Sequence, residues 1–325
     1  MNVASLRAAM RPKARSPRSG EAVRRSAIWL AVLAAIGVGL VVDPDLVLPR
    51  QLSVIARQAA PLGVLAIGQT VVILGRGFDL SVGGVVAFVN VLAANLFAGE
   101  GPAALVVAIC LGVGLLVGAI NGAGIVYARV SPLVMTLGTA FILSGAVLVY
   151  TGGAPTGSVP DGIRALSSSR LLGVSTAVLI WVGLAVLASV LLSGSRVGRY
   201  LYALGGNPTA ARLSGVPVRG VEFGSYVVSG FCAALGGVLL AGYVGQGSLG
   251  AGQDLMLQSL TAVVIGGTTF DGGKGGVSGS VAGAYFLALV AALLTGIGAA
   301  KAGNLITQGV VLAAAAALYR RRSTG

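Results

Sequence analysis

Long apolar stretches recur along almost the whole chain, separated by short segments that carry the charged residues. A stretch of about 20 apolar residues is long enough to cross the hydrocarbon core of a bilayer as a helix. The chain lacks the polar surface that a soluble domain needs, because 56% of its residues are hydrophobic and only 10% are charged. The sequence therefore predicts an all-α, polytopic membrane helix bundle of about ten spans, at residues 27–42, 52–74, 81–98, 102–122, 132–150, 172–193, 223–244, 255–270, 277–300 and 304–319.

The basic residues indicate which ends of these spans face the cytoplasm. Residues 1–25 contain seven Lys and Arg, and they predict a disordered basic tail. Cytoplasmic loops carry an excess of Lys and Arg, so both termini are placed in the cytoplasm, with 17 of the 22 basic residues on that side. Residues 26–320 then form the transmembrane domain, with a loop at 194–222, and residues 321–325 form a C-terminal tail.

Several functional classes are excluded by the residues that the chain lacks. It contains no histidine, and both of its cysteines, Cys110 and Cys232, fall within apolar spans, so no metal site is expected. No nucleophile has a catalytic partner, which argues against an enzyme. The net charge of +13 is not gathered on a water-facing domain, so a nucleic-acid partner is not expected.

A few polar residues interrupt the apolar spans. In hydrocarbon such groups need partners or water, so they are expected to face the bundle interior or a translocation path. Interhelical hydrogen bonding is an equally weighted alternative for any one of them. The candidates for the path are Gln69, Asn90, Asn121, Thr136 and Thr139.

Glycines four residues apart, at Gly114, Gly118 and Gly122, share one face of a span and predict close approach of a neighbouring helix. The chain also contains two similar turns, Phe78-Asp79-x3-Gly-Gly and Phe270-Asp271-x3-Gly-Gly. Each aspartate is expected to cap the N-terminus of the span that follows it. An internal duplication would explain the similarity of the two turns.

The longest polar interruption lies between the sixth and seventh spans. Asn207 is a good N-cap, Pro208 is favoured at the first helical position, and Gly215 followed by Pro217 ends a helix. The loop therefore predicts a short helix on the cytoplasmic face. It can serve either as a docking site for another protein or as an ordinary surface helix.

Four ordered stretches of the chain resemble the permease subunits of bacterial ATP-binding cassette importers for simple sugars, the ribose, xylose and galactose type. The likeness covers roughly residues 50–320. It rests on residues 68–83, on 121–122 with 131–139 and 151–153, on 198–215, and on 262–276.

The resemblance implies a permease without ATPase activity that works as a pair of membrane subunits, two copies or two paralogues, in the bacterial inner membrane. A cytoplasmic ATPase, which binds the ATP and magnesium, would dock on the loop helix, and an extracytoplasmic protein would deliver the sugar. The loop is similar to the Glu-Ala-Ala-x3-Gly coupling motif, with Thr209 in place of the glutamate. The implied coupling residues are Gly205, Asn207, Pro208, Thr209, Ala210, Ala211, Arg212, Leu213 and Gly215.

Two alternatives stay open. The first is the related group of branched-chain amino acid permeases. The second is a stand-alone secondary carrier, which the near absence of carboxylates within the spans disfavours, because such carriers usually bind their coupling ion with them.

Overall fold

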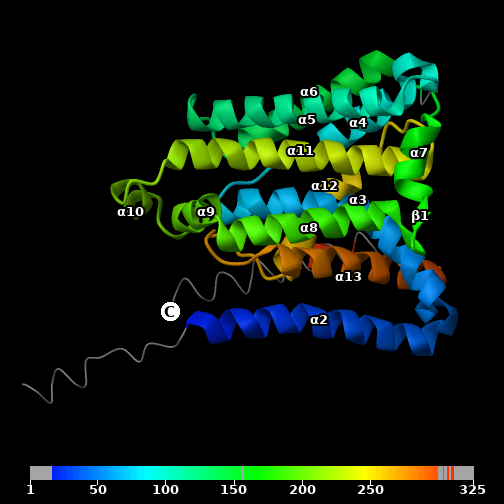
Figure 1. Ribbon diagram of the computed structural model, residues 1–325, viewed down its shortest axis with the longest axis horizontal. Helices are drawn as coiled ribbons and strands as arrows, with labels where there is room; N and C mark the ends of the chain where they lie inside the picture. Colours follow the sequence, from blue (N-terminus) through cyan, green and yellow to red (C-terminus); the bar gives the residue numbers. More distant parts are fainter. Residues whose placement is uncertain (1–16, 155–156, 299–302, 304–305, 307–308, 311–325) are drawn as a thin grey trace, which may run out of the picture.

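A computed structural model describes residues 17–154, 157–298, 303, 306 and 309–310 of the chain. In this part, long helices lie side by side as a bundle (Figure 1). Nine of the predicted spans are found as helices: α2 (Pro17–Val42), α3 (Pro49–Leu74), α4 (Val82–Asn95), α5 (Ala103–Val126), α6 (Pro132–Thr151), α8 (Thr176–Gly194), α11 (Val218–Val244), α12 (Gln253–Ile265) and α13 (Val277–Gly296).

Six of these helices, α3, α5, α6, α8, α11 and α13, are long and apolar enough to cross a bilayer, and the apolar part of α2, α4 and α12 are shorter. The all-α membrane bundle is therefore confirmed. The tenth predicted span, 304–319, and the C-terminal tail lie largely outside the described residues, so the total of ten and the sides of the termini stay predictions. One boundary differs, because α2 begins at Pro17 and residues 17–25 are helical rather than part of a disordered tail.

Several short elements connect the long helices and were not predicted. They are η1 (Pro44–Val47), η2 (Leu96–Gly99), α7 (Asp161–Ser168), the hairpin of β1 (Arg170–Leu171) and β2 (Val174–Ser175), and α9 (Arg196–Gly206). Figure 1 shows α7 lying across the ends of the long helices. Ser167 on α7 donates a hydrogen bond of 2.7 Å to the Leu239 carbonyl, and Arg164 donates one of 2.9 Å to the Gly245 carbonyl. These bonds attach α7 to the end of α11.

The helix α11 lies between α5, α3 and α4, and its contact with α5 depends on glycine. A Cβ atom on Gly118 would lie 2.4 Å from the Tyr226 carbonyl oxygen, and one on Gly230 would lie 2.1 Å from the Gly114 carbonyl oxygen. Backbone atoms thus touch where the two helices cross. The predicted close approach at the Gly114, Gly118 and Gly122 face is confirmed.

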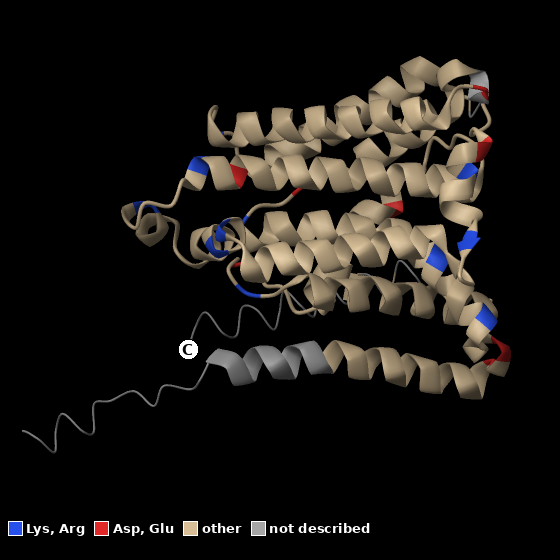
Figure 2. Cartoon of the chain, viewed as in Figure 1, with Lys and Arg blue, Asp and Glu red and all other residues tan. Residues whose placement is uncertain are grey.

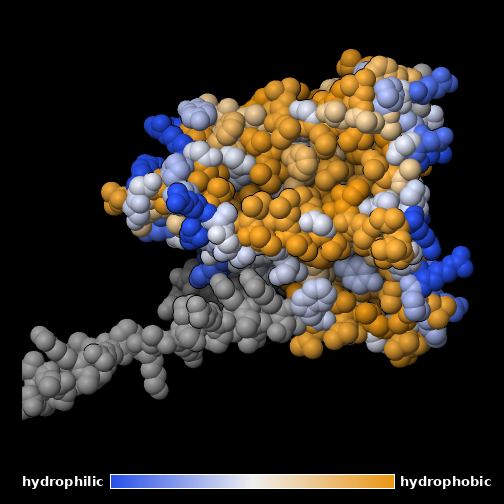
Figure 3. Space-filling view, in the orientation of Figure 1, coloured by the Kyte–Doolittle hydropathy of each residue, from blue (hydrophilic) through white to orange (hydrophobic). Residues whose placement is uncertain are grey.

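The surface of the bundle has the distribution that a bilayer requires. Lys and Arg lie at the two ends and leave the middle free of them in the described part (Figure 2). An apolar band occupies the space between these ends (Figure 3). Large apolar side chains on this band are strongly exposed, among them Phe141 at 70% and Val149 at 86%, which places them against lipid or another membrane subunit.

Candidate functional site

The helix α10 (Pro208–Leu213) projects from one end of the bundle (Figure 1). The Asn207 side-chain oxygen accepts hydrogen bonds from the backbone N–H groups of Thr209 and Ala210, each 3.0 Å long. Asn207 also ends α9, because its own N–H donates to the Ala203 carbonyl. A single residue therefore joins α9 to α10. The predicted cap, start and length of this helix are confirmed.

The two faces of α10 differ. Ala211 is buried against Leu204 and Val218, so it forms the base on which the helix rests. Thr209, Ala210, Arg212 and Leu213 are exposed, and Leu213 is 85% exposed. Gly215, at a φ of +79°, has the left-handed backbone that favours glycine, and it follows Ser214, the C-cap of α10. Of the predicted coupling residues, Ala211 and Gly205 are therefore buried against the bundle. Thr209, Ala210, Arg212, Leu213 and Gly215 are exposed.

The substitution Asn207→Ala is expected to make α10 open more often. Loss of an N-cap side chain costs about 1 kcal/mol, which corresponds to about fivefold faster hydrogen exchange at the amides of α10. Exchange measured on the detergent-solubilised protein checks this. Thr209→Ala is the control, because it leaves the cap intact and should change exchange little.

The end of the bundle that carries α10 is basic. Apart from the first turns of α2, the charged residues on the segments at this end are seven basic and three acidic ones, namely Arg76, Arg129, Arg196, Arg199, Arg212, Arg219 and Lys274 against Asp79, Glu222 and Asp271. The opposite end has four basic residues and five acidic ones, namely Arg50, Arg57, Arg164 and Arg170 against Asp43, Asp45, Glu100, Asp161 and Asp254. This asymmetry matches the charge bias that distinguishes the two sides of a membrane protein.

A polar cluster lies just inside the same end, where three segments meet. Ser81 donates a hydrogen bond of 2.6 Å to Asp79 Oδ1, and the amide of Asn121 donates one of 2.8 Å to Ser81 Oγ. Thr139 then donates one of 2.7 Å to Asn121 Oδ1. Thr136 accepts a bond of 3.0 Å from the Leu80 N–H. The fold thus brings together three of the five predicted path residues.

Asp79 is completely buried in the turn that precedes α4. Burial raises the pKa of its carboxyl above the ordinary value, and the hydrogen bonds from Ser81 oppose this rise. Ser229 on α11 faces the carboxylate and also lowers its pKa, although Ser229 Oγ and Asp79 Oδ2 do not meet hydrogen-bond geometry. Within the described residues no ionic partner contributes to this carboxyl, so its stabilisation comes from hydroxyl and N–H groups.

The other two predicted path residues lie apart from this cluster. Gln69 is fully buried in α3, and neither end of its amide has a partner among the described residues. Asn90 in α4 accepts a hydrogen bond of 2.8 Å from the Ser248 N–H. A buried amide without partners is costly in an apolar interior, so Gln69 is the residue of this set best suited to meet water or a polar solute.

The aspartates of the two similar turns, Asp79 and Asp271, have different surroundings. Asp79 accepts a hydrogen bond of 3.0 Å from the N–H of Ser81, the N-cap residue of α4, and so orders the turn before that helix. Among the described residues no side chain caps the first N–H groups of α4 itself, so the expected capping by Asp79 is wrong. Asp271 is exposed, and α13 begins at Val277 after Gly276 with no side-chain cap. The expected capping by Asp271 is therefore wrong. The reason is that three glycines in this turn, at 272, 273 and 275, take a positive φ and lead the chain away from the helix.

Sequence reasoning missed two features of this region. The hydroxyls of Thr70 and Ser280 are 2.6 Å apart and join α3 to α13 within the core. Tyr226 is fully buried beside the first turn, where a Cβ atom on Gly77 would lie 2.3 Å from its hydroxyl oxygen. The Asp79-x-Ser81 spacing was a local signal for the turn, but nothing local indicated Ser229 or Tyr226.

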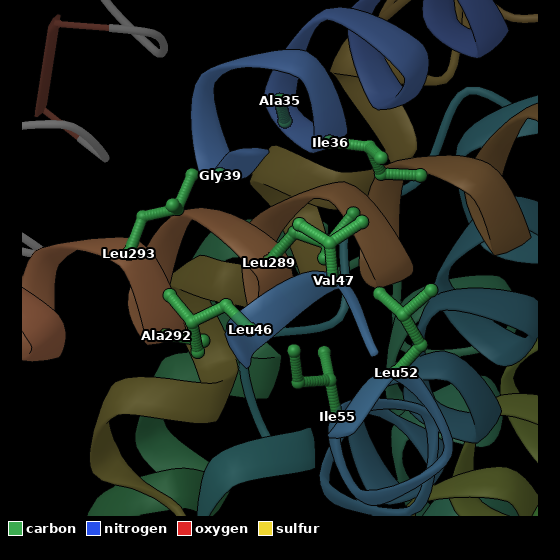
Figure 4. A pocket seen from close by; sticks show the side chains of 10 residues that line it. All are labelled: Ala35, Ile36, Gly39, Leu46, Val47, Leu52, Ile55, Leu289, Ala292 and Leu293. Carbon is green, nitrogen blue, oxygen red and sulfur yellow. The ribbon is translucent and has the colours of Figure 1, made fainter. Parts of the chain in front are cut away.

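A small pocket lies near the other end of the bundle, between α2, η1, α3 and α13 (Figure 4). None of the residues that line it, which include Ile36, Val47 and Leu289, has a polar side chain. A sugar needs hydrogen-bond donors and acceptors, so this pocket is not a sugar site.

Comparison with known proteins gives consistent matches over most of the chain. Residues 51–316 match the family described as the branched-chain amino acid transport system / permease component. A ribose import permease of Escherichia coli is 34% identical over 87% of this chain and 89% of its own length. A ribose import permease of Bacillus subtilis is 32% identical, with 91% and 92% covered. A galactose/methyl galactoside import permease of Escherichia coli is 32% identical, with 91% and 94% covered. No solved structure matches significantly.

Proposed function

The chain belongs to the family of ABC import permeases that includes the ribose and galactose permeases, and from this premise we propose that it carries a simple sugar inward, driven by ATP that a partner hydrolyses. Membership makes it a multi-pass inner-membrane transport subunit and not an enzyme. The substrate class, a simple sugar, and the coupling of ATP hydrolysis to the bundle are the two parts of the proposal.

The observation that carries the proposal is α10. It is a capped helix, joined to α9 through the single residue Asn207, with its outer side chains exposed at the basic end of the bundle. An exposed helix that is fixed from below can transmit a push or pull to the helices that hold it. We therefore assign α10 as the contact for a cytoplasmic ATPase subunit, and with it the basic end and α9 to the cytoplasm. The charge bias of the sequence supports the same side for both chain termini.

The remaining partners follow from the same assignment. ATP and magnesium belong to the ATPase, and an extracytoplasmic binding protein delivers the sugar to the opposite end. A second permease, identical or paralogous, covers part of the exposed apolar band. The polar residues Gln69, Asn121 and Thr139 supply the hydrogen-bonding groups that a hydroxylated solute needs on its way.

Uptake into proteoliposomes tests the substrate class. The permease is purified with its native ATPase and binding protein, and uptake of labelled D-ribose is measured with and without ATP. ATP-dependent uptake of ribose that unlabelled galactose or xylose suppresses supports the proposal. ATP-dependent uptake of leucine instead would indicate a branched-chain amino acid permease. Uptake that does not require ATP but depends on an ion gradient would indicate a secondary carrier.

Docking on α10 is tested by the paired substitution Arg212→Glu and Leu213→Asp. Both side chains are exposed, so the bundle should fold normally while the contact with the ATPase loses an apolar and a charged anchor. Losses of about 2 kcal/mol or more are typical for central contact residues, so the ATPase recovered with the tagged chain should fall at least about tenfold. Ala211→Asp is unsuitable for this purpose, because Ala211 is buried.

The matched control is Arg170→Glu with Leu172→Asp at the other end of the bundle. These side chains are also exposed, and Leu172 is 98% exposed. Equal recovery of the ATPase with both pairs would show that α10 is an ordinary surface helix.

A further inference from the structure

The C-terminal end of α9 rests where the two similar turns of the chain meet. We call residues 74–81, from the last residue of α3 onward, the first turn and residues 266–276 the second turn. The Gly273 N–H donates a hydrogen bond of 2.9 Å to the Leu74 carbonyl, which links the turns directly. The rings of Phe78 and Phe270, one from each turn, pack with their centroids 5.3 Å apart. The turns therefore form one unit, although about 200 residues separate them in the chain.

Gly205 of α9 fits directly against this unit. A Cβ atom on Gly205 would lie 1.9 Å from the Leu74 carbonyl oxygen and 2.2 Å from the Gly273 nitrogen. These are the same two atoms that form the hydrogen bond between the turns. Because both belong to the backbone, no change of rotamer can make room for a larger residue. We call the contact of Gly205 with Leu74 and Gly273 the glycine junction.

Further contacts hold α9 to each turn. The Tyr202 hydroxyl donates a hydrogen bond of 2.9 Å to the Gly275 carbonyl in the second turn. Leu201 is buried beside the first turn, where a Cβ atom on Gly75 would lie 3.3 Å from its side chain. α9 is therefore fixed to both turns along one side, while at its other end it meets α8.

Each turn leads into the core of the bundle. The first turn contains Asp79 and Ser81, which begin α4 and join the polar cluster with Asn121. The second turn leads to α13, and Thr268 within it accepts a hydrogen bond of 3.3 Å from the Gly276 N–H, just before that helix begins. A displacement of α9 at the glycine junction would therefore reach α4 and α13 together.

We propose that the glycine junction transmits the movement of α10 into the bundle, with Gly205 as a positioning residue for ATP-driven transport. This inference rests on the proposed function, since it assumes that an ATPase moves α10. α10 follows α9 after the single residue Asn207, so the two helices move together as one unit. Contact between backbone atoms makes the transmission stiff at this point, because no side chain lies between Gly205 and the backbone of Leu74 and Gly273.

The next residue, Gly206, provides a matched control. A Cβ atom there would meet nothing within 4 Å. Gly205→Ala and Gly206→Ala therefore make the same chemical change in the same helix, one at the junction and one in open space. Tyr202→Phe is a milder second variant, which removes the hydroxyl bonded to Gly275 and adds no atom.

The test measures movement of the second turn without requiring the substrate to be known. Asp271 is exposed in this turn, and the native Cys110 and Cys232 are buried, so an Asp271→Cys substitution gives a selective maleimide site. The labelling rate is measured in the purified complex with its native ATPase, with and without ATP plus vanadate. ATP hydrolysis and thermal melting are recorded for every variant.

In the parent and in Gly206→Ala, ATP with vanadate is expected to change the labelling rate about fivefold or more, as is usual for coupled sites. In Gly205→Ala this change should disappear while the ATPase remains bound and active, and in Tyr202→Phe it should shrink. A purely structural role of Gly205 would lower the amount of complex and leave the change intact in what remains.

Three results would overturn the inference. They are a parent complex in which ATP does not alter labelling, a Gly205→Ala complex that responds like Gly206→Ala, and a Tyr202→Phe complex that responds fully when Gly205→Ala fails to fold. Failure of the proposed function looks different, because then no ATPase accompanies even the parent chain.

Discussion

Replacing Gly118 with leucine is expected to abolish accumulation of the folded protein in the membrane. Even one added carbon would lie 2.4 Å from the Tyr226 carbonyl oxygen and 2.9 Å from the Val227 Cα atom. α5 and α11 would have to separate along the face where Gly114 and Gly230 also touch. Overpacking a tight core typically costs about 1–3 kcal/mol, and here the added atoms meet backbone that no change of rotamer can move, so the loss should exceed that range and remove much of a total stability of about 5–15 kcal/mol.

Gly112→Leu is the control, because a Cβ atom at Gly112 meets nothing within 4 Å and the residue is exposed on the same helix. Both variants add the same apolar side chain to the same span, so insertion into the membrane should be equal. The amount of monodisperse protein after detergent extraction and its melting temperature report the difference. Equal values for the two variants would mean that α5 and α11 do not pack through this face.

Replacing Asp79 with alanine is expected to destabilise the turn before α4 by about 2–5 kcal/mol, as is usual when a buried hydrogen-bonded partner is removed. The change leaves the Ser81 N–H and hydroxyl without their acceptor in a fully buried site. Asp79 also orients the Ser81 hydroxyl, which accepts a hydrogen bond from the amide of Asn121, so this second bond should weaken as well. The first residues of α4 should become less ordered, and α5 should be held less firmly against them.

Asp271→Ala serves as the control, because this residue has the same place in the similar turn but is exposed. Its effect should stay within about 0.5 kcal/mol, which is typical for surface positions. Asp79→Asn should fall between the two, since the amide keeps one acceptor oxygen. Thermal melting of the three variants in one detergent checks the order. A melting temperature of Asp79→Ala equal to that of Asp271→Ala would contradict the role of the buried cluster.

Sequence reasoning predicted most of the bundle but missed its short elements. α7 carries Arg164 and Ser167, whose partners are carbonyl groups at the end of α11, far away in the chain. α9 lies within the polar interruption that also contains α10. Its N-cap, Ser195, accepts a hydrogen bond of 3.1 Å from the Gly198 N–H, but the prediction drew only on the Asn207-Pro208 start of α10. Neither helix is long or apolar enough to be recognised as a span, so hydropathy did not reveal them.

The sequence by itself determined the features that depend on neighbouring residues. The length and apolar character of each span decide whether a helix satisfies its backbone hydrogen bonds in the bilayer, and Asn207 with Pro208 starts α10 through contacts two or three residues away. The tertiary structure alone decided that Asn121 donates a hydrogen bond to Ser81, the partner of Asp79, and that Gly205 meets Gly273. Such contacts depend on which faces of separate helices pack together. In lipid, an apolar span gains a similar packing energy from many possible neighbours, so its sequence does not specify which helix it contacts.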